Sequence, residues 1–426
     1  MRRWLGLIFS CFVSVLFGKP LTVEVLAPSA IVMNAETGAI LYTKNHHERR
    51  HPASITKIAT ALYVLEKKGD FLDGIKTTAT REALMIVPTE VRQAPDTRHP
   101  PYRLEYGGTS MGLLVGEEHT LRTLLYGLIH PSGNDAANVL AEHMSGSVNR
   151  FMQELNGYLK GHGMRESHFV SPHVLHHPDH WTTAYDMAVL TQKALQHPTF
   201  REIVKAARYP CPKSSKQPAR DLLQHNRLVK PGAHFYSKAI GVKIGSTLKS
   251  GRTLVAAATH EGRELIAVLL GCSEGRRNFT DAVKLFEAAF AEKLVTRVLF
   301  AKGSDRFSHA VSGAKASVNA VLKEDLVLQY FPAEEPTFRA EIEWLPCKLP
   351  IRAQESVGFL RLVTEEGVIL KQLPLVAAES VSPKWWLYPI LFFKTHKTIF
   401  MALFLGAQVT LLLFYFLKKN QKIRQR

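Results

Sequence analysis

The residues of this chain best suited to chemistry are a serine and a lysine three positions apart, Ser54 and Lys57. An apolar stripe at helical spacing follows them, formed by Ile58, Leu62 and Leu65. Ser54 is therefore expected near a helix N-terminus, where the backbone dipole favours a developing alkoxide, with Lys57 one turn away on the same face. A buried lysine can lose its proton near neutral pH and then accept the proton of a serine hydroxyl. The pair is thus a candidate nucleophile and general base, although a serine at such a position is more often only a helix cap.

A second serine motif, Ser132-Gly133-Asn134, follows an apolar run that ends at Ile129 and precedes another helical pattern. In a chemical interpretation, Ser132 relays protons and the Asn134 amide holds a peptide carbonyl. The same residues also suit a turn followed by a helix cap. Spacing alone leaves both interpretations open.

The third motif, Lys243-Ile244-Gly245-Ser246-Thr247, ends a predicted strand. Two further apolar runs, 252–259 and 264–270, are separated by a short turn containing glycine, which predicts a β-hairpin beside this strand. Gly245 would allow the backbone of a substrate to approach closely, and Lys243 offers a positive charge to a carboxylate. The alternative is an ordinary edge strand that carries a solvated lysine.

Longer stretches around these motifs resemble the D-alanyl-D-alanine carboxypeptidases, which are the low-molecular-mass penicillin-binding proteins of the serine D,D-peptidase family. Beyond the three motifs, the resemblance rests on residues 36–42, 49–57, 169–173 and 182–187. It implies an α+β fold, a transpeptidase- or β-lactamase-like antiparallel sheet flanked by helices. It also implies a carboxypeptidase that removes the terminal D-alanine from peptidoglycan stem pentapeptides, without a cofactor or a metal.

The resemblance assigns a catalytic role to each matching residue. Ser54 would attack the penultimate D-alanyl carbonyl, with Lys57 as the general base and Ser132 as a proton relay. The backbone N–H groups of Ser54 and Ser246 would form the oxyanion hole, which often contributes several kcal/mol to catalysis. Water would then hydrolyse the acyl-enzyme, and penicillin-type inhibitors would be trapped on the same serine.

The resemblance also implies a substrate-binding set on the second and third motifs: Asn134, Lys243, Gly245, Ser246 and Thr247. Ile244 departs from the family, which usually has threonine there, so the hydroxyl that contacts the substrate carboxylate is missing. A lost hydrogen bond to a charged group is worth about 1.5–3 kcal/mol, or about 10- to 150-fold in binding or rate. Thr247 is a candidate to supply a hydroxyl instead, and either Arg276 or Arg277 is expected to contact the carboxylate.

Three other functions share part of this pattern. Ile244 leaves open a weakly active or non-catalytic peptidoglycan-binding scaffold, although a pure binder has no need of the pair Ser54 and Lys57. A D,D-endopeptidase would use the same residues on cross-linked strands. A penicillin-hydrolysing lactamase needs a further carboxylate for deacylation, and no Glu-x-x-x-Asn arrangement follows Ser132.

Neither a metal site nor a disulfide framework is expected. Four histidines lie between residues 173 and 180, but their spacing does not match a zinc helix motif such as His-Glu-x-x-His, and Pro178 interrupts any helix there. Outside the N-terminal segment the chain has an odd number of cysteines without paired spacing: Cys211, Cys272 and Cys347. One bridge among them stays open.

Both ends of the chain carry apolar segments. Residues 1–18 combine two arginines with an apolar run, which predicts a signal peptide, with an uncleaved anchor as the alternative. Residues 398–417 are almost wholly apolar and long enough to be a transmembrane helix, and the basic tail 418–426 would be cytoplasmic. Residues 383–397, rich in aromatic side chains, would lie at the outer membrane–water interface. The body is therefore expected outside the cytoplasm, attached to the cell membrane.

The net charge of +17 does not predict binding of nucleic acid. Residues 384–426 hold eight Lys and Arg and no acidic residue, so a large part of the excess belongs to the C-terminal end. No basic stripe with interleaved aromatic residues occurs in the body.

The chain between the two ends is expected to form two domains. Residues 19–295 would be the D,D-peptidase domain. Residues 296–382 carry short alternating runs separated by turns, which predicts a small all-β domain that acts as a spacer. Residues 88–108, rich in proline and charge, would be an insertion relative to the family, either a lid or a disordered loop.

Overall fold

The computed structural model describes residues 9–11, 19–87, 99–173, 177–273, 275, 277–304, 306–365, 367–389, 392 and 396–424. It divides into two compact units. The N-terminal unit comprises residues 18–294 and 331–335, and the C-terminal unit comprises 1–17, 295–330 and 336–426. The predicted signal peptide, apart from residues 9–11, lies outside the described residues, and so does 88–98 of the predicted insertion.

A five-stranded antiparallel sheet forms the centre of the N-terminal unit, in the order β10-β11-β12-β2-β3. Its strands come from both ends of the unit's sequence: β2 (Ser29–Asn34), β3 (Ile40–Lys44), β10 (Ala239–Thr247), β11 (Gly251–His260) and β12 (Arg263–Cys272). Successive residues of a strand point to opposite faces. Accordingly, Val255 and Val268 pack in the core on one face, and Leu254 and Leu269 pack in the core on the other.

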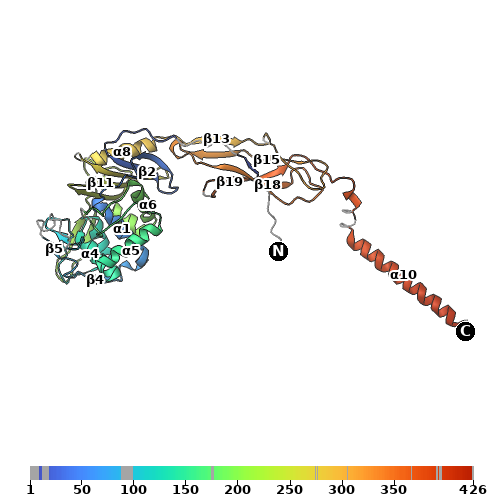
Figure 1. The fold of residues 1–426 in the computed structure, drawn as a ribbon, viewed down its shortest axis with the longest axis horizontal. Helices are drawn as coiled ribbons and strands as arrows, with labels where there is room; N and C mark the ends of the chain where they lie inside the picture. Colours follow the sequence, from blue (N-terminus) through green and yellow to red (C-terminus); the bar gives the residue numbers. More distant parts are fainter. Residues whose placement is uncertain are drawn as a thin grey trace. The chain divides into compact units, whose positions relative to one another are not determined.

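Helices cover both faces of this sheet (Figure 1). On one face lies α8 (Arg277–Phe290), which buries an apolar stripe that includes Leu285 and Phe286. The other face carries the remaining long helices of the unit: α1 (Lys57–Lys68), α3 (Leu121–Ile129), α4 (Asn134–Ser145), α5 (Val148–Gly161), α6 (Ala184–Ala194) and α7 (Pro198–Lys205). The predicted antiparallel sheet with helices on both faces is therefore present.

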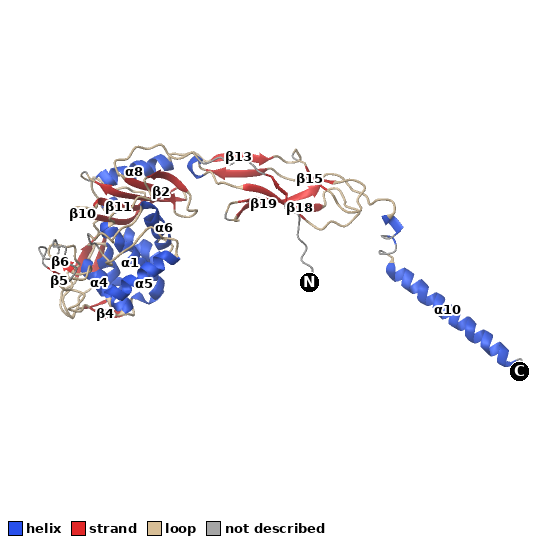
Figure 2. Ribbon diagram, in the orientation of Figure 1, coloured by secondary structure: helices blue, strands red, loops and turns tan. Residues whose placement is uncertain are grey.

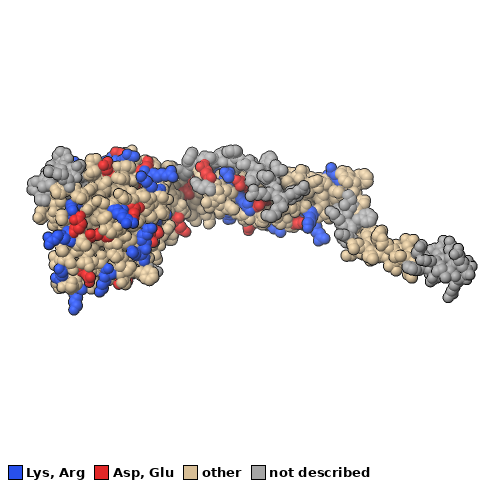
Figure 3. All heavy atoms as spheres, turned by 60° about the horizontal axis from the view of Figure 1, so that its bottom comes forward, with Lys and Arg blue, Asp and Glu red and all other residues tan. Residues whose placement is uncertain are grey.

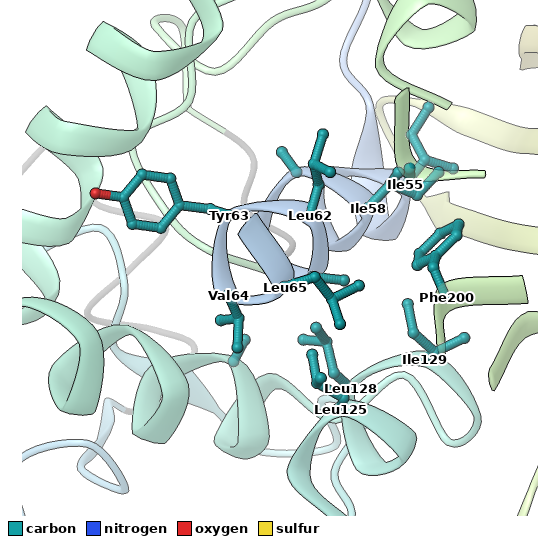
Figure 4. Packing of buried hydrophobic residues seen from close by; sticks show 14 of the residues in the cluster. Ile55, Ile58, Leu62, Tyr63, Val64, Leu65, Leu125, Leu128, Ile129 and Phe200 are labelled. Atoms are coloured by element: carbon teal, nitrogen blue, oxygen red, sulfur yellow. The ribbon is translucent and has the colours of Figure 1, made fainter. Parts of the chain in front are cut away.

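Helix α1 lies in the middle of this helical layer. The apolar stripe predicted from Ile58, Leu62 and Leu65 is fully buried and lies against side chains of α3 and α7 (Figure 4). Burying one such side chain contributes about 1.5–3 kcal/mol. This packing fixes the position of α1, and with it the residues at its N-terminal end.

Short elements complete the N-terminal unit. They are η1 (Ala53–Thr56), η2 (Gly69–Leu72), β4 (Lys76–Thr78), β5 (Ile86–Val87), β6 (Leu104–Glu105), β7 (Glu118–Thr120), β8 (Arg208–Cys211), β9 (Arg220–Leu223), η3 (Arg227–Val229) and η4 (Pro332–Glu334). β5 and β6 pair in parallel on either side of 88–98. Within the predicted insertion, Tyr102 is buried and its carbonyl accepts a hydrogen bond from Asn138 Nδ2 at 2.8 Å. This end of the insertion is therefore part of the packed unit.

The C-terminal unit is built mainly of strands (Figure 2). They are β1 (Phe9–Cys11), β13 (Val295–Phe300), β14 (Phe307–His309), β15 (Val318–Leu322), β16 (Leu326–Tyr330), β17 (Arg339–Trp344), β18 (Ser356–Val363) and β19 (Ile369–Ala377). Six of them form one sheet in the order β1-β17-β18-β19-β15-β14, and β13 pairs with β16. Val318, Leu360 and Leu375 are buried in its core, in line with the alternating sequence pattern.

A helix, α10 (Lys397–Arg424), follows the strands of this unit. Several of its apolar side chains are exposed, among them Ile399, Leu403 and Phe404. Over the part of the chain that the structure describes, no helix is both long and apolar enough to cross a membrane. The transmembrane helix expected at 398–417 is therefore not supported by the structure.

Charged side chains of both signs are interspersed on the surface drawn in Figure 3. Lys and Arg alternate there with Asp and Glu over the N-terminal unit rather than forming one continuous stripe. Cys211, Cys272 and Cys347 are free thiols, the first two of them buried.

Candidate active site

Ser54 lies in η1, the single turn that leads into α1. The residue before it, Ala53, has φ +54°, which is uncommon for a residue with a side chain. Thr253 Oγ1 of β11 donates a hydrogen bond to the carbonyl of Pro52 at 2.9 Å and ties this turn to the sheet. The Ser54 side chain caps neither helix. The structure thus presents Ser54 on a constrained turn held by neighbouring elements.

Lys57 brings the first two sequence motifs together. Its Nζ lies 3.0 Å from Ser54 Oγ, 3.3 Å from Ser132 Oγ and 2.7 Å from Asn134 Oδ1. The Lys57 side chain is fully buried, and both serines are nearly so. Two serine hydroxyls and one amide oxygen therefore surround a single amine that is shielded from water.

The electrostatics of the site favour a neutral amine. Burial, and then the positive charge of Lys243, lower the pKa of Lys57 well below that of an ordinary lysine, while the Asp135 carboxylate opposes the shift. Burial also lowers the pKa of Lys243 to about 7. Because its neutral form is accessible, Lys57 can accept the proton of the Ser54 hydroxyl.

Ser132 is held in the left-handed region, with φ +62°. Its carbonyl accepts a hydrogen bond from Thr109 Oγ1 at 2.6 Å, and the Asn134 N–H donates to the Thr109 carbonyl at 2.9 Å. A Cβ at Gly133 would lie 2.9 Å from the Gly127 carbonyl oxygen, so no larger residue fits there without a shift. These contacts fix Ser132 and Asn134 on either side of Lys57, and α4 begins at Asn134.

A residue that the sequence interpretation missed, Asp135, supports this loop. Its carboxylate is buried and accepts hydrogen bonds from Ser110 Oγ at 2.5 Å and from three successive backbone N–H groups at 3.0 Å each: those of Met111, Gly112 and Leu113. An acidic residue in the first turn of a predicted helix was the available signal. Asp135 therefore positions the loop that faces Ser132.

Strand β10 forms the opposite wall of the site. A Cβ at Gly245 would lie 2.7 Å from the Ser54 backbone nitrogen and 2.5 Å from Thr253 Oγ1, so only glycine allows this close approach. β10 is the end strand of its sheet. Its outer edge therefore offers backbone donors and acceptors to an extended peptide. The N–H groups of Ser54 and Ser246, expected to form the oxyanion hole, belong to these two facing segments.

The other residues of the third motif have distinct surroundings. Lys243 is buried and its Nζ donates a hydrogen bond to the Ile244 carbonyl at 3.1 Å. Thr247 Oγ1 donates to Ser250 Oγ at 2.7 Å and accepts from the Ser250 N–H at 3.0 Å. The Thr247 hydroxyl is thus engaged in the β10–β11 turn and is not free to replace the one that Ile244 lacks.

The structure describes only one of the two arginines that were expected to contact the substrate carboxylate. Arg276 lies outside the described residues, and Arg277 is the first residue of α8.

Ile244 is half-buried and packs with the core on the α8 side of the sheet, whereas Lys243 points to the opposite face.

The histidines near residue 180 contact protein groups. His180 is fully buried, and its Nε2 lies 2.9 Å from Thr56 Oγ1, next to the turn that carries Ser54. His173 Nε2 lies 3.0 Å from the Tyr102 carbonyl oxygen. Among the described residues, no group of three or more His, Cys, Asp or Glu is arranged to hold a metal ion.

This geometry is suited to covalent catalysis by a serine. Ser54 Oγ is the candidate nucleophile, with Lys57 Nζ within reach of its proton, and Ser132 Oγ lies close enough to Lys57 Nζ to be a candidate proton relay. An extended acyl substrate along β10 would bring its carbonyl to the N–H groups beside Ser54.

Comparison with known proteins yields one family. The model of the peptidase S11 family, described as D-alanyl-D-alanine carboxypeptidase, matches residues 17–274. The D-alanyl-D-alanine carboxypeptidase DacC of Escherichia coli is 33% identical over 390 residues, covering 87% of this chain and 88% of that protein. DacF of Bacillus subtilis is 27% identical over 366 residues, covering 83% of this chain and 86% of its own length.

Solved structures share the fold of this chain. The D-alanyl-D-alanine carboxypeptidase DacD of Francisella tularensis shares the fold with a TM-score of 0.58 at 22% identity, over 88% of this chain and 98% of that chain. The Streptomyces K15 DD-transpeptidase aligns with a TM-score of 0.54 at 30% identity, over 63% of this chain and 98% of its own. The N-terminal unit therefore has a transpeptidase-like fold.

Proposed function

The chain belongs to the D-alanyl-D-alanine carboxypeptidase family of serine hydrolases, and on this basis we propose that it removes the terminal D-alanine from peptidoglycan stem pentapeptides through an acyl-enzyme on Ser54. The observation that carries the proposal is the fully buried Lys57, whose Nζ lies 3.0 Å from Ser54 Oγ. Burial and the charge of Lys243 lower the pKa of Lys57, which favours the neutral amine that can accept a proton.

The reaction follows from the geometry of the site. Ser54 Oγ attacks the carbonyl of the penultimate D-alanine while its proton moves to Lys57 Nζ. The N–H groups of Ser54 and Ser246 stabilise the oxyanion. The C–N bond then breaks, and the leaving D-alanine takes the proton from Lys57 through Ser132 Oγ, 3.3 Å away. Water hydrolyses the remaining ester and restores Ser54.

A non-catalytic scaffold is not favoured. Binding alone does not require a buried lysine next to a serine, and burying an amine costs stability. D,D-endopeptidase activity uses the same residues and differs only in the group that leaves.

Trapping by a penicillin tests the nucleophile. Incubation of the full-length protein with benzylpenicillin should add the mass of one intact antibiotic, and peptide mapping should place the adduct on Ser54. Ser54→Ala should show no adduct. An adduct on another residue, or none on the wild-type protein, would count against the proposed site.

The location of the protein belongs to the same proposal. Residues 1–18 would direct export, and the apolar stretch 398–417 within α10 would attach the protein to the outer side of the cell membrane. The exposed apolar side chains of α10, such as Leu403 and Phe404, support attachment, since such a surface is normally covered by lipid or protein. Deleting residues 384–426 should move the protein from the membrane fraction to the soluble fraction. An unchanged membrane fraction would contradict the role given to α10.

A further inference from the structure

His180 is a buried histidine that the mechanism above does not use. Its side chain is fully buried, and its ring is tilted against that of Phe169, with the two centroids 5.2 Å apart. The two ring nitrogens have different partners: the Val170 N–H donates to Nδ1 at 3.3 Å, and Nε2 lies 2.9 Å from Thr56 Oγ1. Thr56 is the last residue of η1, the turn that carries Ser54. The ring therefore connects the segment near residue 170 to the turn of the nucleophile.

The hydrogen-bond partners determine where this ring carries its proton. Because the Val170 N–H donates to Nδ1, that nitrogen has no proton, and a neutral ring must then carry its proton on Nε2. Burial, and then the neighbouring His173, lower the pKa of His180 well below that of an ordinary histidine, which favours the neutral ring. The Nε2–H group of His180 therefore donates to Thr56 Oγ1.

Thr56 connects the ring to the peptide group that precedes Ser54. Thr56 is fully buried, and its hydroxyl donates to the Ala53 carbonyl at 2.9 Å. That carbonyl and the Ser54 N–H belong to one peptide group, so a donor at the oxygen increases the positive partial charge on the N–H. The Ser54 N–H is one of the two donors assigned to the oxyanion hole. Two successive hydrogen bonds thus run from His180 to the peptide group that would stabilise the oxyanion.

We propose that His180 and Thr56 are positioning residues that orient and polarise the Ser54 N–H as an oxyanion donor. The inference rests on the proposed function and deepens it. Donors that are held in place before the reaction need not reorganise when charge develops, and linked hydrogen bonds strengthen one another away from water. The bond to the Ala53 carbonyl also helps to hold the uncommon φ of +54° at that residue. No proton moves along this chain, because each group keeps its own hydrogen.

Thr56→Val and Thr60→Val form a matched pair for the test. Thr60 lies one turn later in α1, is also fully buried, and donates to the Pro172 carbonyl at 2.7 Å. Each substitution removes one buried hydroxyl, and the hydroxyl of Thr56 is the one that contacts the peptide group of Ser54. The second-order rate constant for acylation of the full-length protein by benzylpenicillin should fall about tenfold in Thr56→Val. This is less than the loss of about 10²–10³-fold that follows removal of a whole oxyanion donor. Thr60→Val should leave the rate constant unchanged.

The carbonyl stretch of the acyl-enzyme reports on the oxyanion donors directly, because stronger hydrogen bonds to an ester carbonyl lower its frequency. Difference infrared spectra with an isotope-labelled β-lactam carbonyl would isolate this band. The band should move to higher frequency in Thr56→Val and stay in place in Thr60→Val. His180→Gln keeps an N–H donor and should resemble the wild type in rate and band. His180→Leu removes the donor and should resemble Thr56→Val.

The outcomes separate the inference from the proposed function. Equal rates and equal ester bands for Thr56→Val and Thr60→Val would overturn the inference and leave the proposed function intact. A slower Thr56→Val with an unchanged band would also overturn it, since Thr56 would then be a structural residue only. If Thr56→Val does not fold, the comparison of His180→Gln with His180→Leu decides on the same two measurements. A wild-type protein that forms no acyl-enzyme would overturn the proposed function and the inference with it.

Discussion

The pKa of Lys57 depends on the groups that surround its amine. Protonated Lys57 cannot accept a proton from Ser54, so acylation should slow as the pH falls through the pKa of Lys57. Burial and the charge of Lys243 both lower that pKa and extend activity to lower pH. Lys243→Met removes the second cause, so the pKa of Lys57 should rise and the acid limb of the rate profile should move to higher pH.

The pH dependence of the second-order rate constant for acylation by a penicillin measures this shift. Lys249→Met, at an exposed position of the β10–β11 turn, serves as the control and should leave the limb where it is. An acid limb that stays in place or moves to lower pH in Lys243→Met would show that the charge of Lys243 does not act on Lys57.

Asp135 is predicted to matter for stability as well as for activity. Asp135→Ala removes the common acceptor of the Ser110 hydroxyl and three backbone N–H groups. The free energy of unfolding should fall by about 2–4 kcal/mol, since several hydrogen bonds to a charged acceptor are lost. Urea unfolding of the full chain measures the change, with the exposed Asp221→Asn as the control. Equal midpoints for the two variants would refute the anchoring role.

At the scale of single residues, the sequence indicated which side chains could take part in chemistry, but it did not indicate which other residues they contact. The spacing of Ser54 and Lys57 predicted a pair on one helical face, and the structure places them 3.0 Å apart. No local pattern indicated that Thr247 would be hydrogen-bonded to Ser250, or that the Asp135 carboxylate would accept hydrogen bonds from the loop at 110–113. Such contacts depend on tertiary structure, which brings together loops that are distant in sequence.

At the scale of elements, the active site depends on how closely β10 approaches the turn before α1. Gly245→Ala would place a Cβ 2.7 Å from the Ser54 backbone nitrogen and push the strand away. A displacement of about 1 Å near reacting groups costs about 100-fold in rate, so kcat/KM should fall by about that factor. Gly157→Ala is the control, because a Cβ there meets open space on α5 and should be neutral or slightly stabilising.

The kcat/KM of the two glycine variants would be measured from steady-state D-alanine release. Activity of Gly245→Ala close to that of the wild type would mean that the spacing between β10 and Ser54 is not critical. A comparable loss in Gly157→Ala would instead indicate that any change of glycine disturbs the unit.

Regular elements were predictable where periodicity was strong. The stripe of Ile58, Leu62 and Leu65 predicted α1, and the two apolar runs separated by a short turn predicted β11 and β12. The role of Tyr102 was not predictable, because a loop rich in proline and charge gave no sign that its carbonyl would meet buried Asn138. Nor did the strand pattern alone show that Ile244 lines a pocket with basic residues, since these come from the segment 227–230 before β10 and from the neighbouring strand β11.

At the scale of the whole molecule, a short segment of the later sequence belongs to the N-terminal unit. Residues 331–335 bring Glu334 to Arg263, with Nε to Oε1 at 2.8 Å, and to Asn34 Nδ2 at 3.0 Å. Arg263 also pairs with Glu292 at 2.9 Å, and all three charged side chains are largely buried. The fold of the N-terminal unit therefore uses residues beyond the range that the family model matches.

Glu334→Ala should destabilise the N-terminal unit. It leaves a buried guanidinium with one carboxylate fewer, and breaking a buried pair by removing one partner costs about 3–5 kcal/mol. Urea unfolding of the full chain would be monitored through the loss of activity. The midpoint for Glu334→Ala should be lower than that for the control variant Glu324→Ala, which changes an exposed glutamate of the C-terminal unit. Equal midpoints would show that the segment contributes no stability.

The division into a mixed unit and a β unit could be anticipated from the change in periodicity near residue 295, because alternation and helical spacing are local properties. The segment 331–335 could not, because its partners lie far away in sequence. The transmembrane helix was inferred from hydropathy alone and is not supported by the described part of the structure.

Release of D-alanine from a stem pentapeptide tests the central claim most directly. The full-length wild-type protein and its Ser54→Ala variant would be incubated with the peptide, and free D-alanine would be quantified over time. The account predicts release by the wild type and none above background by Ser54→Ala, because the nucleophile is absent. Equal release by both proteins would place the nucleophile elsewhere, and no release by either would contradict the carboxypeptidase activity itself.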